Sequence, residues 1–156
     1  MPVRPVVIAN NFIKLDKESK GEGFDLMQLI KLSYIAHGVY LAQTSKPLSC
    51  EQAIAWPKGP VFKSLTYLTL NHGLENKFTE KIETIGDLEK NLTSKMTEVI
   101  KRVYEKYKGK SGKFLSGLTH EDNTPWAKTL KKYGGAIKEQ VIDDETIKEH
   151  YKRNFA

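Results

Sequence analysis

Residues 115–126, LSGLTHEDNTPW, gather side chains that could do chemistry into a stretch without helical or strand periodicity. The stretch holds one histidine, two carboxylates and two threonines, followed by a tryptophan. His120 and Glu121 would open the H-E-x-x-H motif of zinc proteases, but Thr124 stands where the second histidine is required. The other histidines are scattered along the chain, so the sequence predicts no metal site.

Nucleophilic and phosphate-binding motifs are also incomplete. Ser116 lies in FLSGL, which lacks the first glycine of the G-x-S-x-G nucleophile elbow. Cys50 is the only cysteine, and we expect it in a short strand as a small core residue. The GKSGK segment at 109–113 is similar to part of a phosphate-binding loop, but Tyr104 stands where that loop needs its first glycine. We therefore expect no catalytic residue and no cofactor, and a protein that is not an enzyme.

The 115–126 stretch is better explained as a corner between two helices. Its threonines can bond to the local backbone, and Glu121 and Asp122 place negative charge just before a helix start. We expect His120 to bridge a backbone carbonyl to one of these acids, and Trp126 to carry apolar surface into the core or an interface. Two interpretations stay open: a purely structural corner, or a corner that also faces a partner.

Length and composition predict one domain that spans residues 1–156. No apolar run approaches the roughly 20 residues of a membrane span, and the N-terminal residues lack the apolar core of a signal peptide. A single cysteine excludes an intrachain disulfide. We therefore expect a soluble, cytoplasmic protein without membrane contact.

The fold class that we expect is mainly α (α+β), a compact helical domain around a buried central helix with two or three short β-strands. Asp25 and Gln28 form a capping box for the central helix, and the following residues, 26–43, are apolar on most of its circumference. A strand is predicted at 50–56 and a turn at 56–61. A helix is then predicted from Val61 to His72 by the spacing of its apolar residues.

The second half of the chain is predicted to be helical with one strand. Residues 92–107 carry a clear amphipathic stripe that ends at Gly109. Ser111 is expected to cap a short helix, and Thr124 followed by a proline is expected to open another. KEQVI at 138–142 is a candidate strand, and Asp143 or the next residue starts a terminal helix.

The net charge of +6 is unevenly distributed. Residues 95–113 contain seven basic residues, and residues 139–149 contain five acidic ones. A basic stretch of this kind is more often a solvated helix face than a nucleic-acid groove, and the acidic segment could fold back onto it. The candidate basic surface comprises Lys101, Arg102, Lys106 and Lys108.

Several blocks of this sequence resemble the Panacea domain family, which includes SocA-like antitoxins and phage-associated GepA proteins. The blocks span nearly the whole chain, and their order and spacing are more specific than any one of them. They are ANNFIKL at 9–15, IKLSYIAHGVYLA at 30–42, AWPKGPV at 55–61, LSGLTHEDNTPW at 115–126 and IDDETIKEHY at 142–151. The chain departs from the family pattern at Ile30, where a polar residue is frequent, and at His37, where glutamine is common.

The resemblance implies an antitoxin that neutralises a toxin encoded beside it by binding it directly. An alternative within the family is an adaptor that delivers the toxin to a ClpXP-type protease. A second alternative, taken from the residues alone, is a nucleic-acid-binding regulator that uses the basic stretch at 95–113; we expect its nucleic-acid binding to be weak. A third is an unrecognised hydrolase built around His120.

The candidate partner-binding residues are Trp56, Lys58, Gly59, Pro60, His120, Glu121, Asp122 and Trp126.

Overall fold

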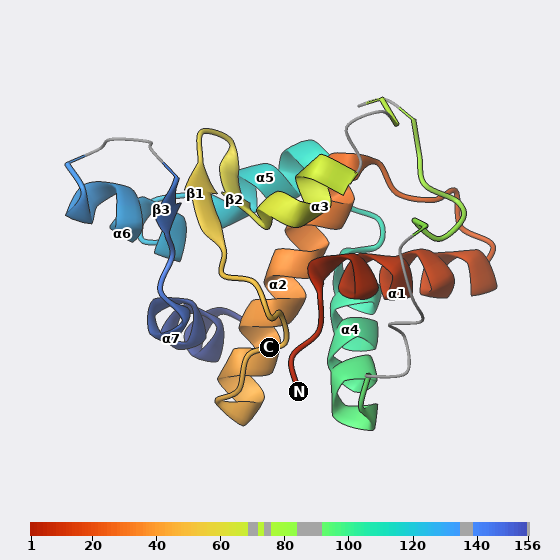
Figure 1. Ribbon diagram of the computed structural model, residues 1–156, viewed down its shortest axis with the longest axis horizontal. Helices are drawn as coiled ribbons and strands as arrows, with labels where there is room; N and C mark the ends of the chain where they lie inside the picture. The colour runs from red at the N-terminus through yellow and green to blue at the C-terminus, as the bar shows by residue number, and fades with distance from the viewer. Residues whose placement is uncertain (69–71, 74–75, 84–91, 135–138, 156) are drawn as a thin grey trace.

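A computed structural model describes residues 1–68, 72–73, 76–83, 92–134 and 139–155 of the chain, and it is mainly helical with one small sheet, as predicted (Figure 1). The helices are α1 (Pro5–Glu18), α2 (Leu26–Thr44), α3 (Lys63–Leu68), α4 (Ser94–Tyr107), α5 (Gly112–Thr119), α6 (Pro125–Lys132) and α7 (Asp144–Asn154). The strands are β1 (Ile54–Trp56), β2 (Gly59–Val61) and β3 (Gln140–Val141).

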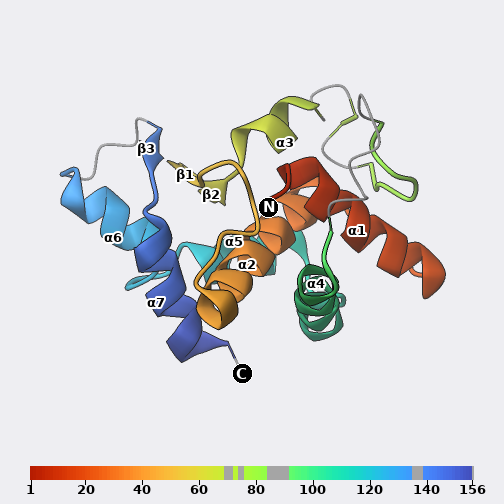
Figure 2. The same ribbon diagram turned by 60° about the horizontal axis from the view of Figure 1, so that its bottom comes forward.

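Helix α2 is the central helix that the sequence predicts. It runs through the middle of the molecule, with α1, α4, α5 and α7 packed around it (Figures 1 and 2). Every residue from Leu29 to Leu41 is buried. The predicted capping box is present, because the Asp25 carboxylate accepts from the Gln28 N–H and the Gln28 amide oxygen accepts from the Asp25 N–H, both at 2.8 Å. The helix therefore starts where its local sequence specifies.

Helix α7 closes the core by packing against α2. A Cβ added at Gly38 would lie 2.2 Å from the Tyr151 ring, so only glycine allows the two helices to approach this closely. Asp143 caps α7, and the next residue, Asp144, accepts a hydrogen bond from Nε2 of the buried His37 at 2.9 Å. Nδ1 of His37 accepts from the Ser49 N–H at 3.1 Å, which defines a neutral ring protonated at Nε2.

The sheet is antiparallel, in the order β2-β1-β3. The expected helix from Val61 to His72 is wrong at its start, because Val61 pairs with Ile54 in the sheet and α3 begins at Lys63; residues 69–71 of the expected helix lie outside the described residues. The local apolar spacing was outweighed by strand pairing with β1. The expected strand at 50–56 is shorter than predicted, and Cys50 lies before it and is exposed, so it is not a core residue.

The predicted caps at Ser111 and Thr124 are present, and α7 starts where expected. Thr93, Ser111 and Thr124 accept hydrogen bonds from backbone N–H groups and cap α4, α5 and α6. For residues 74–92 the sequence favours a loop with one short strand, and residues 74–75 and 84–91 of this stretch lie outside the described residues. Within the described part, Phe78 forms a bridge with Phe24. Among these helices none is long and apolar enough to span a membrane.

Candidate functional site

The tip of the β1–β2 hairpin presents Lys58 to solvent. Trp56 pairs with Gly59, so Pro57 and Lys58 form the two-residue connection. Both are exposed, whereas Gly59 and Pro60 are buried. Gly59 has φ +113°, a backbone conformation that other residues rarely adopt. The AWPKGPV block is therefore a rigid hairpin with one exposed cation at its tip.

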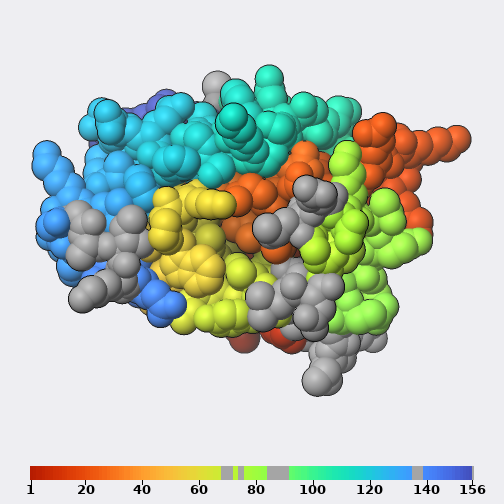
Figure 3. All heavy atoms as spheres, turned by 90° about the horizontal axis from the view of Figure 1, so that it is seen from above, coloured from red at the N-terminus to blue at the C-terminus, as the bar shows by residue number. Residues whose placement is uncertain are grey.

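The 115–126 corner is hydrogen-bonded directly to this hairpin. The Ser116 hydroxyl donates to the Lys58 carbonyl at 2.7 Å. The Trp126 indole N–H donates to the Trp56 carbonyl at 2.6 Å. These contacts join residues 58 and 70 positions apart, and they hold the two blocks side by side on one surface. Figure 3 looks onto this surface, where the hairpin lies in yellow between the α5–α6 segment in cyan and α3 in yellow-green.

Lys31 of the central helix supplies a third link to the hairpin. Its side chain is fully buried, and Nζ donates to the Pro60 carbonyl at 2.8 Å. β2 is an edge strand, and proline has no N–H to leave unpaired on that edge. Burial lowers the pKa of Lys31 to about 7, because an ammonium group is poorly solvated in the core. The hydrogen bond between α2 and the hairpin is therefore made by Lys31.

Three polar atoms converge where Gly59 has no side chain. An ideal Cβ at Gly59 would lie 2.9 Å from Lys31 Nζ, and 3.5 Å from both His120 Nδ1 and Thr119 Oγ1. Thr119 donates its hydroxyl hydrogen to the α5 backbone, so its oxygen lone pairs face this space. The hairpin, the central helix and the corner therefore meet at a close approach that only glycine permits.

The expected role of His120 is wrong. Its ring does not bridge a carbonyl to Glu121 or Asp122, because both acids are exposed while the ring turns inward. The ring lies edge-on to Trp126, with centroids 5.2 Å apart. Nδ1 is buried and has no hydrogen-bond partner within the described part of the chain. The predicted local bonds of Thr119 and Thr124 are present.

This arrangement offers little to a reaction mechanism. The Lys31 amine is fully buried, so it does not face solvent. Both ring nitrogens of His37 are already engaged, so it cannot act as a general base. No three His, Cys, Asp or Glu side chains cluster as metal ligands in the described ranges. The geometry is that of a braced surface, by which we mean a hairpin whose backbone is held in place by hydrogen bonds from Lys31, Ser116 and Trp126.

The candidate partner-binding residues divide by exposure. Lys58, Glu121 and Asp122 are exposed, and Trp56, His120 and Trp126 are half-buried. Gly59 and Pro60 are buried, so any part they play in binding is to shape the hairpin. No acid of the described chain lies within ion-pair distance of Lys58, which leaves its charge available to a partner.

The candidate basic surface lies on α4, where Lys101, Arg102, Lys106 and Lys108 are all exposed. The acidic segment does not fold back onto it. Among the described residues its acids pair with side chains of α2, α3 and α7, namely Asp144 with His37, Glu139 with Lys63, Glu145 with Lys148, and Glu149 with Lys152 and Arg153. Phe155 reaches α4 instead, with Lys106 Nζ 4.6 Å and Arg102 Cζ 5.5 Å from its ring centroid. Part of this basic surface is thus used within the chain.

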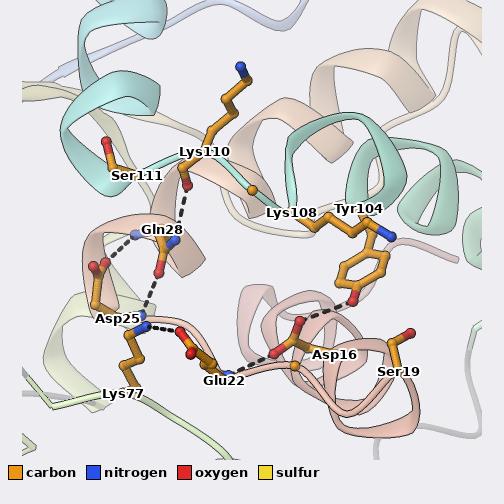
Figure 4. Close-up of a pocket in the computed structure, with 13 residues that line it drawn as sticks. Asp16, Ser19, Glu22, Asp25, Gln28, Lys77, Tyr104, Lys108, Lys110 and Ser111 are labelled. Atoms are coloured by element: carbon orange, nitrogen blue, oxygen red, sulfur yellow. Dashed lines mark hydrogen bonds and ion pairs between the residues drawn. The ribbon is translucent and has the colours of Figure 1, made fainter.

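A polar hollow of about 580 Å³ lies at the N-terminal end of α2, between α1, α4 and the start of α5 (Figure 4). Its polar groups largely satisfy one another. Asp16 accepts from the Tyr104 hydroxyl at 3.0 Å and from the Gly23 N–H at 2.7 Å. Lys77 lies 3.5 Å from Glu22 at its rim. Burial raises the pKa of Tyr104, which keeps its hydroxyl a donor. The hollow is therefore explained as a junction between helix ends.

Sequence reasoning did not identify Lys31 as a site residue. The signal was present, since a lysine within a long apolar helix must either reach water or find an acceptor. Its acceptor, Pro60, is 29 residues away and becomes evident only from the fold.

Comparison with known proteins gives one match. A protein-family model described as "Antitoxin SocA-like, Panacea domain" matches residues 29–127. No curated protein and no solved structure matches the chain at a significant level. The matched range begins within α2 and ends within α6, so it includes Lys31, the hairpin and the corner.

Proposed function

Because the chain belongs to the SocA-like antitoxin family with its Panacea domain, we propose that it is an antitoxin that neutralises a toxin by binding it directly. The family name points to an antitoxin role in general. The partner that we propose is a toxin protein encoded beside it.

The observation that carries this proposal is the joining of the hairpin tip and the corner into one braced surface. Lys31, Ser116 and Trp126 each contribute a hydrogen bond that fixes the hairpin backbone. A surface that is already ordered loses little conformational entropy on binding, which favours tight association. Lys58 then projects a charge from a fixed position.

We propose binding without catalysis. This is supported by the burial of Lys31, by the engaged ring of His37 and by the inward direction of His120 Nδ1. A hydrolase built around His120 would need that nitrogen to reach a substrate. The alternative of a nucleic-acid regulator is less well supported, because two of the basic side chains on α4 already contact Phe155.

The test is rescue of cell growth by co-expression with the protein encoded by the neighbouring reading frame. Lys58→Glu should reduce rescue at matched expression, and Lys14→Glu, at an exposed position on α1, should rescue fully. Equal rescue by both variants would argue against the hairpin surface. Failure of the wild-type chain to rescue, with soluble expression of both proteins, would argue against the antitoxin function.

The level of the toxin separates direct binding from delivery to a protease. Under direct binding, neutralised cells keep the toxin at its usual abundance in a stable complex. An adaptor would lower that abundance, and the loss would disappear in a strain without ClpXP-type protease.

A further inference from the structure

The sheet has one buried face and one apolar face that reaches solvent. The pairing register places Ala55 beside Pro60 and Gln140 on one face, and Ala55 is fully buried. Successive side chains of a strand point to opposite faces, so Ile54 and Trp56 belong to the other face. We call this second face the outer face of the sheet.

The outer face presents a continuous apolar row. Ile54 lies directly opposite Val61 on one side and Val141 on the other. Val61 is buried, Ile54 and Trp56 are half-buried, and Val141 is 41% exposed. The row thus joins an exposed valine at the sheet edge to a half-buried isoleucine and tryptophan.

A side-chain ion pair lies across this face. Lys63, just after β2, has its Nζ 3.1 Å from Glu139, just before β3. β1 separates these two strands, and both side chains are partly exposed, so the pair spans β1 on the outer side. Lys63 Nζ also lies 5.7 Å from the centroid of the Tyr67 ring, which is 54% exposed. The hydrogen bond to Glu139 raises the pKa of Lys63.

The charges around the outer face favour an acidic occupant. The chain itself places a carboxylate, that of Glu139, beside Lys63, so a carboxylate fits at this position. Lys58 borders the face at the hairpin tip, and Lys131 and Lys132 end the neighbouring helix α6. None of these three lysines has an acidic partner among the described residues. A partner that supplied carboxylates would complement this border.

We propose that the outer face of the sheet is the surface that contacts the toxin, and that the toxin presents there an apolar side chain flanked by carboxylates. This inference rests on the proposed antitoxin function and specifies its interface. The apolar side chain packs on Trp56, Ile54 and Val141, and the toxin carboxylates face Lys58 and Lys63.

The test measures binding of the purified neighbour-encoded protein to variants at Val141, which is exposed enough to substitute without disturbing the core. Val141→Asp adds a negative charge facing the toxin carboxylates, and Val141→Lys adds a positive one. We expect Val141→Asp to weaken binding by about tenfold or more, and by several times more than Val141→Lys. Phe114→Asp is the matched control, because Phe114 is similarly exposed, at 46%, on α5. It should change binding by less than about threefold.

A second variant, Glu139→Gln, frees Lys63 for the toxin and should tighten binding a few-fold. Thermal melts of all variants first establish that they are folded. If the wild-type chain binds the toxin but Val141→Asp binds it as well as Val141→Lys does, the outer face of the sheet is not the toxin-contact surface. The proposed antitoxin function would still stand. If the wild-type chain does not bind, the proposed function itself fails.

Discussion

The amine of Lys31 donates a hydrogen bond of 2.8 Å to the carbonyl of Pro60, from the middle of the central helix to an edge strand. The bond lies beneath the hairpin that carries Lys58, in a fully buried position. His120, which follows α5, faces the same space, because its Nδ1 would lie 3.5 Å from a Cβ at Gly59. A buried amine thus supports the exposed surface that we propose for partner binding.

Lys31 should make stability rise with pH above neutrality. Its pKa falls from 10.5 in the unfolded chain to about 7 in the fold, so the unfolded state binds more protons between these values. The free energy of unfolding should therefore increase from about pH 7 to about pH 10.5, by at most about 1.4 kcal/mol per pH unit. Thermal melts of wild type and Lys31→Met between pH 6.5 and 9.5 test this, because only the wild type should gain stability from Lys31 as the pH rises. The same pH dependence of stability in both proteins would contradict the role of Lys31.

Gly59→Ala should be strongly destabilising. Its φ of +113° strains any residue with a side chain, and the new Cβ would lie 2.9 Å from Lys31 Nζ. We expect a loss of about 1–3 kcal/mol in denaturant unfolding. Gly117→Ala is the control, because a Cβ at that helical position meets nothing within 4 Å. It should be neutral or stabilise by up to about 1 kcal/mol, and equal losses in both would refute the explanation.

His37→Gln should fold as stably as wild type. A glutamine amide offers one acceptor and one donor, as the neutral ring does toward the Ser49 N–H and the Asp144 carboxylate. His37→Leu removes both bonds and leaves the Ser49 N–H buried, at a cost of about 1–3 kcal/mol. Denaturant titration measures the stability of the two variants. Similar unfolding midpoints for His37→Gln and His37→Leu would show that these hydrogen bonds do not contribute to stability.

Binding to generic duplex DNA should be weak and lost near physiological salt. Log affinity should fall with log salt by about 0.9 per phosphate neutralised. The double variant Lys101→Glu/Arg102→Glu should abolish this binding and leave toxin binding unchanged, because α4 is separate from the outer face of the sheet. Sequence-specific, nanomolar DNA binding at physiological salt would make a regulator the leading function.

The parts of the fold that sequence reasoning predicted are those set by nearby residues. The capping box joins Asp25 and Gln28 within one helical turn, and Thr124 caps α6 in the same way. These contacts depend little on the rest of the molecule. The central position of α2 was readable from its apolar circumference, because a helix without a polar face must be surrounded.

The parts that were missed depend on distant contacts. Val61 has helical spacing to the residues after it, but pairing with Ile54 draws it into a strand. The direction of the His120 ring is set by Trp126 and by the close approach of Gly59, neither of which its local sequence specifies. The hairpin and the corner were each recognised as motifs, while the bonds that join them link residues 58 and 70 positions apart.

The packing of α7 on α2 has a consequence for biosynthesis. His37 and Asp144, which bond across this contact, are 107 residues apart. The ribosome must therefore make α7 before α2 gains this covering helix, and until then the face of α2 that contacts α7 is exposed. A message truncated before the α7 codons would yield a chain with its central helix uncovered. Newly made protein thus reaches its native core only after residues 144–154 have been translated.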